Sequence, residues 1–116
     1  MNDEIRDRFK TACEGLYYIS ETDAPIEVVD DVPVGYEGAE VRSFDMFFAP
    51  LIAIHPGYRE PQIERAKKFL ELKSLLEGSL NDLAVYKFGG TRKTIYIVGR
   101  DAGGKLVGLR TEAVET

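Results

Sequence analysis

Few side chains of this sequence could do chemistry, and His55 is the first of them. It is the only histidine and lies in the segment IHPGY, beside a proline and a glycine. Histidine can act as a general acid or base near neutral pH, but no nucleophile motif such as G-x-S-x-G accompanies it. The pattern therefore favours a structural or solvated loop histidine. An enzyme that uses His55 with nearby carboxylates is the weakest of three hypotheses.

Three further patterns fall short of a binding site. FGGTRKT, residues 88–94, lacks the G-x-x-x-x-G-K-[ST] spacing of a phosphate loop and precedes a predicted strand rather than a helix. Cys13 is the only cysteine, and one cysteine with one histidine cannot build a zinc site. The carboxylates between Asp23 and Asp31 lack the spacing of a calcium loop. We therefore expect no cofactor and no metal ion held by the chain itself.

Composition narrows the classes of partner. Fifteen basic residues against twenty acidic ones give a net charge of −5, which argues against direct binding of nucleic acid, since that affinity comes from Lys and Arg at phosphates. An acidic surface favours a basic partner by steering the encounter, although mild acidity is also common in soluble proteins. A hydrophobic content of 44% and a charged content of 30% are typical of a folded protein.

Length and segment content set the expected organisation. The 116 residues fit one domain spanning 1–116. We see no apolar run near the roughly 20 residues that span a bilayer, and MNDEIRDRFK lacks the apolar core of a signal peptide. We expect a cytoplasmic protein, with no membrane contact, that is a monomer when free.

Three helices are expected from caps and periodicity. Asn2 can cap a first helix that ends near Gly15. SFDMFFAP, residues 43–50, predicts a short helix that begins at Ser43 and stops before Pro50. Pro61 suits the first turn of a long helix that ends at Gly78. The apolar side of that helix is predicted to comprise Ile63, Ala66, Phe69, Leu70, Leu72, Leu75 and Leu76.

Strands are expected in two regions. In the first half, LYYIS and residues 26–30 are rich in β-formers and flank SETDAP, predicted as a loop, and a third strand is suggested at 39–41. The last third alternates over residues 84–88, 93–99 and 105–114, with GGTR and DAGG as hairpin turns. These elements predict an α+β domain with helices packed on a sheet and a C-terminal antiparallel three-strand meander.

Two segments carry a resemblance to a known family. ACEGLYYISETDAPIEVV, residues 12–29, and VYKFGGTRKTIYIVGRDAGGKLVGLRTEAVET, residues 85–116, resemble the nuclease A inhibitor family. VRSFDMFF and KKFLELKSLLEGSL are similar to its short aromatic helix and its long amphipathic helix. The resemblance implies an α-β-α sandwich that is a variant of the plant PR-1 type. It also implies an inhibitor that occludes a metal-dependent, sugar-non-specific DNA/RNA endonuclease.

The resemblance also implies which residues bind the nuclease. Thr116 matches the family's terminal threonine, which reaches the nuclease's catalytic metal, and Glu21 matches a loop glutamate that engages its basic groups. The oxygen atoms of Thr116 would suit a magnesium or manganese ion of the partner. Glu115 is set aside, because strand alternation would turn it to the opposite side.

One position departs from the family pattern. An Asp-Trp pair before the long helix is matched here by Pro56 and Gly57, and the chain contains no tryptophan. Tyr58 is the candidate to supply aromatic area instead, so Gly57 and Tyr58 join the predicted partner-binding residues. The missing tryptophan keeps a second hypothesis open: a binding module of the same fold that engages a different protein. Neither of these two hypotheses makes the chain an enzyme.

Overall fold

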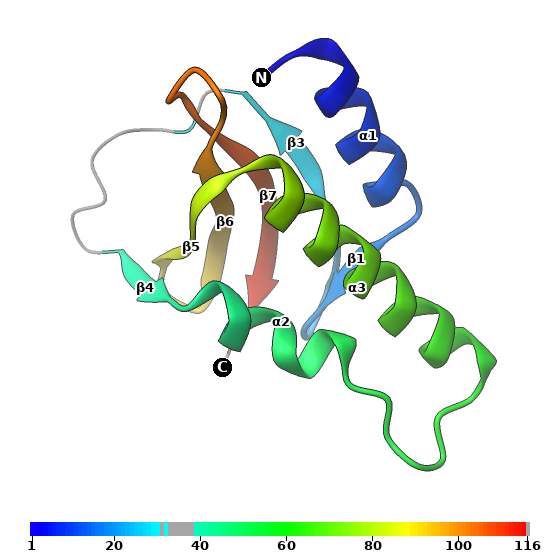
Figure 1. The fold of residues 1–116 in the computed structure, drawn as a ribbon. Coiled ribbons are helices and arrows are strands. Elements are labelled where there is room, and N and C mark those ends of the chain that lie inside the picture. Colours follow the sequence, from blue (N-terminus) through cyan, green and yellow to red (C-terminus); the bar gives the residue numbers. More distant parts are fainter. Residues whose placement is uncertain (31, 33–38, 116) are drawn as a thin grey trace.

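A five-stranded antiparallel sheet forms the centre of the computed structural model, which describes residues 1–30, 32 and 39–115 (Figure 1). Its strand order is β3-β7-β6-β5-β4, and β1 and β2 form a separate two-stranded antiparallel sheet. The elements of the described residues are, in chain order, α1 (Asp3–Cys13), β1 (Tyr17–Ile19), β2 (Asp23–Pro25), β3 (Glu27–Val29), β4 (Glu40–Arg42), α2 (Phe44–Ile52), α3 (Glu60–Ser79), β5 (Asn81–Gly89), β6 (Arg92–Arg100) and β7 (Leu106–Val114).

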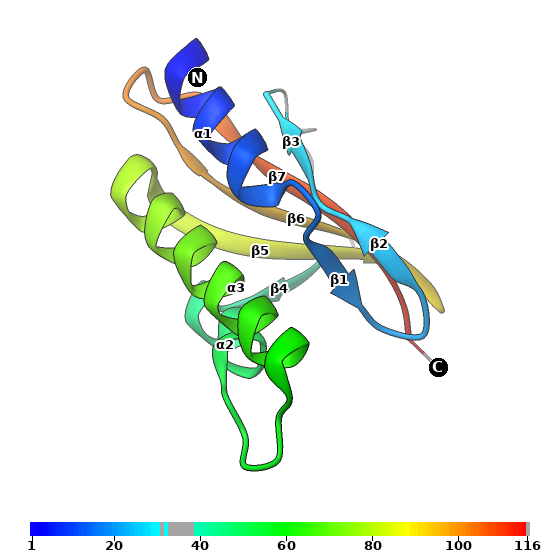
Figure 2. The same ribbon diagram turned by 90° about the vertical axis from the view of Figure 1, so that its right-hand side faces the viewer.

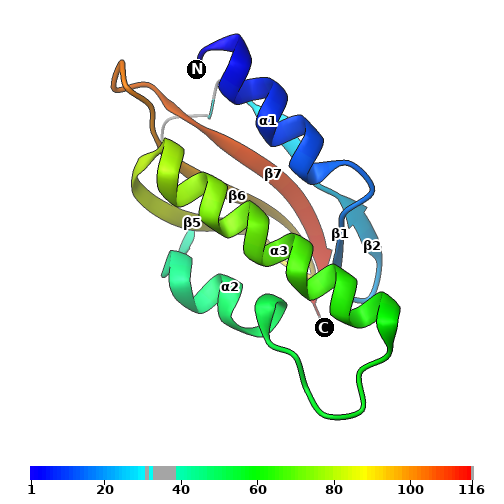
Figure 3. The ribbon, with the colours of Figure 1, turned by 45° about the vertical axis from the view of Figure 1, so that its right-hand side comes forward.

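One face of the sheet makes the core. Val85, Ile97 and Leu109 are cross-strand neighbours on β5, β6 and β7, and each is at most 1% exposed. They belong to one apolar cluster with side chains from all three helices. Figures 2 and 3 show α1, α2 and α3 on that same side of the sheet.

The α+β class and the C-terminal meander are confirmed, because β5, β6 and β7 pair in sequence order as antiparallel neighbours. The helices of the described residues form a single layer on the sheet (Figure 2). A third layer is not seen in that part of the chain, and the PR-1-like assignment stays a prediction.

The helix starts follow local rules, and two details of the helices were predicted wrongly. The Asn2 side chain caps α1 by accepting from the Ile5 N–H at 2.8 Å. Pro50 lies inside α2, which continues to Ile52. Proline removes one N–H from the helix, but Leu51 and Ile52 pack against the core and stabilise the extra turn.

Leu70 is the second wrong detail, because it is 48% exposed rather than on the apolar side of α3. The buried positions of α3 are Ala66, Phe69, Leu72 and Leu76. Each residue turns a helix by about 100°, so Leu70 lies beyond the edge of that stripe.

One predicted loop contains a strand. SETDAP forms a turn at residues 20–22 followed by β2, whose Asp23–Pro25 pair with β1. The strand suggested at 39–41 is present as β4, whereas most of the residues between β3 and β4 lie outside the described residues. The described helices include none that is long and apolar enough to cross a membrane.

The β1–β2 hairpin depends on β7 for its position. Thr111, 1% exposed on the inner face of β7, donates its hydroxyl hydrogen to the carbonyl oxygen of Pro25 at 3.1 Å. A two-stranded hairpin is marginal by itself, so this half-buried bond, together with Tyr18 stacked on Phe47 at 5.6 Å, joins the hairpin to the rest of the fold.

We expect Thr111→Val to destabilise the protein by about 0.5–1.5 kcal/mol, because the hydrogen bond to the carbonyl oxygen of Pro25 would be lost while the side chain keeps its shape. Urea unfolding followed by circular dichroism measures this. Thr111→Ser is the control that keeps the hydroxyl. A valine variant as stable as the wild type would show that the bond contributes nothing.

Candidate functional site

Three segments distant in sequence meet at the end of β7. The backbone N–H of Val114 donates to Ser20 Oγ at 3.0 Å, and the N–H of Glu115 donates to the carbonyl oxygen of Thr91 at 2.8 Å. The β1–β2 turn and the β5–β6 turn therefore hold the last described residues between them. Figure 2 shows the tip of the hairpin beside the C-terminal end.

Glu21 lies in the β1–β2 turn, between Ser20 and Thr22, and is exposed. The turn is closed by Ser20: its N–H donates to the carbonyl oxygen of Thr22 at 2.9 Å, and its hydroxyl donates to the same oxygen at 3.2 Å. Because Ser20 also binds Val114, the turn that carries Glu21 lies against the end of β7. Thr116 lies outside the described residues, and Val114 and Glu115 before it are placed.

Glu115 is engaged within the molecule. Its Oε1 lies 2.9 Å from Nζ of Lys87, a side chain only 10% exposed. The hydrogen bond from Lys87 lowers the pKa of Glu115 below its ordinary value, with further attraction from Lys93 and Arg42. An inward lysine needs such a partner, because burial without one is costly. Glu115 is therefore bound to Lys87 within the molecule. This contact, rather than the strand alternation, is the reason for leaving Glu115 out of the predicted partner-binding residues.

Gly57 and Tyr58 lie in the loop between α2 and α3. The Tyr58 N–H donates to the carbonyl oxygen of His55 at 3.1 Å, which closes a turn with Pro56 and Gly57 at its centre. Gly57 has φ of +90°, as the third residue of a type II turn requires. The rings of His55 and Tyr58 meet edge to face with centroids 5.1 Å apart.

A cavity links this loop to the β1–β2 hairpin. It has a volume of about 220 Å³, and its walls include Tyr17 and Ile19 of β1, Tyr58 of the loop and Arg65 of α3. Tyr17 and Ile19 are 47% and 46% exposed. The loop and the hairpin tip also lie toward the same end of the molecule, opposite the N-terminus (Figures 1 and 2). The loop that carries Gly57 and Tyr58 and the hairpin that carries Glu21 thus lie toward one end of the fold.

The side chains with catalytic potential do not form a recognisable centre in the described residues. Cys13 is buried, and burial raises the pKa of its thiol to about 12, so it is not a nucleophile. No group of three or more His, Cys, Asp or Glu side chains in that part of the chain is arranged to hold a metal ion.

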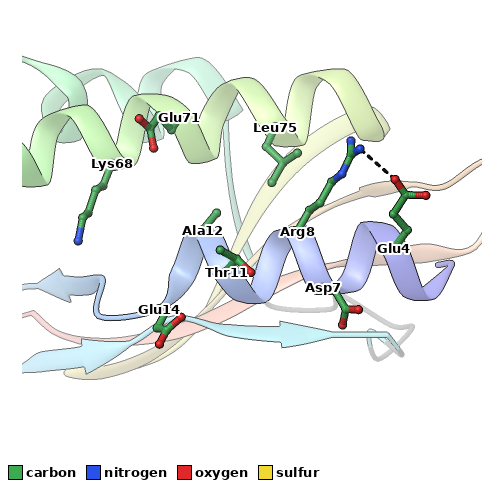
Figure 4. Close-up of a pocket in the computed structure, with 9 residues that line it drawn as sticks. All are labelled: Glu4, Asp7, Arg8, Thr11, Ala12, Glu14, Lys68, Glu71 and Leu75. Atoms are coloured by element: carbon green, nitrogen blue, oxygen red, sulfur yellow. Dashed lines mark hydrogen bonds and ion pairs between the residues drawn. The ribbon is translucent and has the colours of Figure 1, made fainter.

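A larger cavity lies away from the predicted residues, between α1 and α3 (Figure 4). Its volume is about 610 Å³, and its walls carry charges of both signs over the apolar side chains of Ala12 and Leu75. Arg8 and Glu4 pair with each other at 2.9 Å along α1. The cavity is therefore a mixed surface groove between two helices and includes none of the predicted partner-binding residues.

Sequence reasoning missed Ser20, Thr111 and Lys87, which position the site. Thr111 occupies a position of β7 that the strand alternation turns toward the core, and a polar side chain at such a position indicates a buried hydrogen bond. Serine in a turn signals a bond to nearby backbone. Neither signal identifies Pro25 or Val114 as the partner, because those contacts join residues 86 and 94 positions apart.

The comparisons with known proteins agree with the resemblance. The family described as nuclease A inhibitor-like protein matches residues 35–116, more than half of the chain. No curated protein matches the chain significantly. The matched range includes Gly57, Tyr58 and Thr116, whereas Glu21 and the β1–β2 hairpin precede it.

We expect Glu115→Gln to flatten the pH dependence of stability in acid. Because the pKa of Glu115 is lower in the folded protein than its ordinary value of 4.5, the ion pair with Lys87 stabilises the fold above that value and is lost as pH falls through the lowered pKa. Thermal unfolding between pH 6 and pH 3 measures this. The exposed Glu71→Gln is the control, and parallel curves for wild type and Glu115→Gln would contradict the expectation.

Proposed function

The chain belongs to the nuclease A inhibitor-like family, and from that premise we propose that it inhibits a metal-dependent, sugar-non-specific DNA/RNA endonuclease by occluding its active site. In this proposal Thr116 reaches the catalytic metal of the nuclease and Glu21 engages its basic residues. The inhibitor itself is no enzyme, holds no metal or cofactor, and acts in the cytoplasm as a monomer when free.

One observation supports this proposal above the others. The turn that carries Glu21 is hydrogen-bonded to Val114, two residues before Thr116. The Glu21 turn and Val114, far apart in sequence, therefore lie at one end of the molecule (Figure 2). A surface that carries both can meet both a cation and a neighbouring basic group in one cleft.

The chemistry of the two groups suits a nuclease. Such an active site is built to bind a polyanion beside a hard cation, and hydroxyl and carboxylate oxygens are the ligands that Mg²⁺ accepts. A carboxylate at Glu21 can accept two hydrogen bonds from an arginine that would otherwise hold phosphate. The inhibitor would imitate phosphate without offering a bond to cleave, and its net charge of −5 would speed the encounter with a basic cleft.

The loop between α2 and α3 supplies the proposed second contact. Tyr58 and the exposed Tyr17 and Ile19 border one cavity beside the Glu21 turn. Aromatic side chains are frequent anchors of protein interfaces. We assign Tyr58, on the turn made by Gly57, to the rim of the nuclease contact.

The alternative is a binding module that engages a protein other than a nuclease. The observation that favours it is the absence of tryptophan, with Pro56 and Gly57 at the positions of the family's Asp-Trp pair. A folded wild-type chain that fails to inhibit or bind any nuclease of this class would favour the alternative.

Extending the chain past Thr116 by two glycines should abolish inhibition and leave the fold intact, because the added residues would block approach to the metal. The measurement is titration into a purified ββα-metal nuclease with a Mg²⁺-dependent DNA cleavage readout. A circular dichroism spectrum and a thermal unfolding midpoint equal to those of the wild type are the control for an intact fold. Full potency of the C-terminal extension would refute the plug mechanism.

Glu21→Ala should weaken nuclease binding by about 2 kcal/mol or more, as expected when one partner of a buried charge pair is removed. Surface plasmon resonance on a catalytically inactive nuclease measures the change. Glu71→Ala removes an exposed carboxylate from α3, outside the proposed interface, and should bind as the wild type does. Equal losses in the two variants would indicate general electrostatic attraction rather than a specific contact.

A further inference from the structure

The outer edge of β7 changes partner along its length. β3 pairs with β7 only at Gly108, Leu109 and Arg110. Beyond Arg110, the β1–β2 hairpin lies along this edge (Figure 2), and in the described residues no ladder joins it to β7. Two side-chain hydroxyls make the connection instead, those of Thr111 and Ser20.

The hydroxyl of Ser20 is fully used inside the molecule. It donates to the carbonyl oxygen of Thr22 at 3.2 Å and accepts from the N–H groups of Thr22 at 3.4 Å and Val114 at 3.0 Å. A serine hydroxyl has one hydrogen to donate and two lone pairs to accept with. Its whole capacity therefore goes to shaping the turn around Glu21 and joining that turn to the last strand.

The two sides of this junction are held differently. Glu115, next to Val114, is also bonded to Thr91 and to Lys87 from the β5–β6 side. Glu115 therefore keeps both of these contacts if the Ser20 bond is lost. The base of the hairpin keeps the Thr111 bond to Pro25, whereas at the hairpin tip Ser20 accepts a hydrogen bond from the Val114 N–H of β7.

We propose that Ser20 is a positioning residue that holds Glu21 in register with the end of β7, an inference that rests on the proposed function and deepens it. Ser20 does not touch the nuclease. It keeps the Glu21 turn at a set place relative to Val114, so that both groups of the inhibitor enter one cleft without a separate ordering cost for the hairpin tip. Its loss leaves Glu115 bonded to Thr91 and Lys87 and removes the hydrogen bond that joins the Glu21 turn to β7.

A double-mutant cycle tests this assignment. Ser20→Ala should weaken binding to the inactive nuclease about tenfold, chiefly through faster dissociation. In the Glu21→Ala background the same substitution should change the affinity less than threefold, because the group that it positions is gone. Ser20→Thr keeps the hydroxyl and should restore most of the affinity.

A matched control separates positioning from general stability. Asn2 also accepts a backbone N–H through its side chain, at 2.8 Å from Ile5, but at the opposite end of the molecule (Figure 1). Asn2→Ala should leave the affinity unchanged. Equal effects of Ser20→Ala with and without Glu21, wild-type affinity of Ser20→Ala, or an equal loss in Asn2→Ala would each overturn the assignment.

Amide hydrogen exchange tests the junction without a nuclease. The Val114 N–H should be protected in the wild type and should exchange at least tenfold faster in Ser20→Ala, while the Glu115 N–H, bonded to Thr91, keeps its protection. Unchanged exchange at Val114 would overturn the assignment. A wild-type chain with the expected protection but no nuclease binding would instead refute the proposed function, so the two failures are distinguishable.

Discussion

The antiparallel pairing of β6 with β7 determines where the end of β7 lies. Nine consecutive residue pairs run without a shift from Arg100↔Leu106 to Arg92↔Val114. The inward side chains of β7, at Val107, Leu109 and Ala113, are fully buried. A slip of one residue would turn that buried set toward solvent, so the register is strongly specified and the position of Val114 with it.

The β1–β2 hairpin takes its place from the same strand. Its strands have three residues each and pair only with one another. What holds it is a buried hydroxyl on β7, a stacked aromatic pair and the serine at its tip. An end built in this way is ordered without being part of the main sheet. Side-chain hydroxyls, rather than backbone ladders, set the geometry between Glu21 and the chain end.

Local rules account for much of the fold, and the exceptions have identifiable causes. The cap at Asn2 and the long alternation of the C-terminal strands were predictable, because both depend on neighbours in the sequence. The continuation of α2 past Pro50 was not, since it depends on burial of Leu51 and Ile52 against other elements. β2 was missed because three residues containing a proline carry little strand signal.

The sequence by itself determined the class of the fold, the meander, the lack of a familiar catalytic motif and, through resemblance, the candidates Glu21, Gly57, Tyr58 and Thr116. Only the tertiary structure decided that the Glu21 turn lies against the end of β7. Periodicity and propensity act over a few residues, whereas Ser20 and Val114 are 94 positions apart. Their contact exists because the sheet brings β7 next to the hairpin, where the backbone N–H of Val114 donates to the hydroxyl oxygen of Ser20.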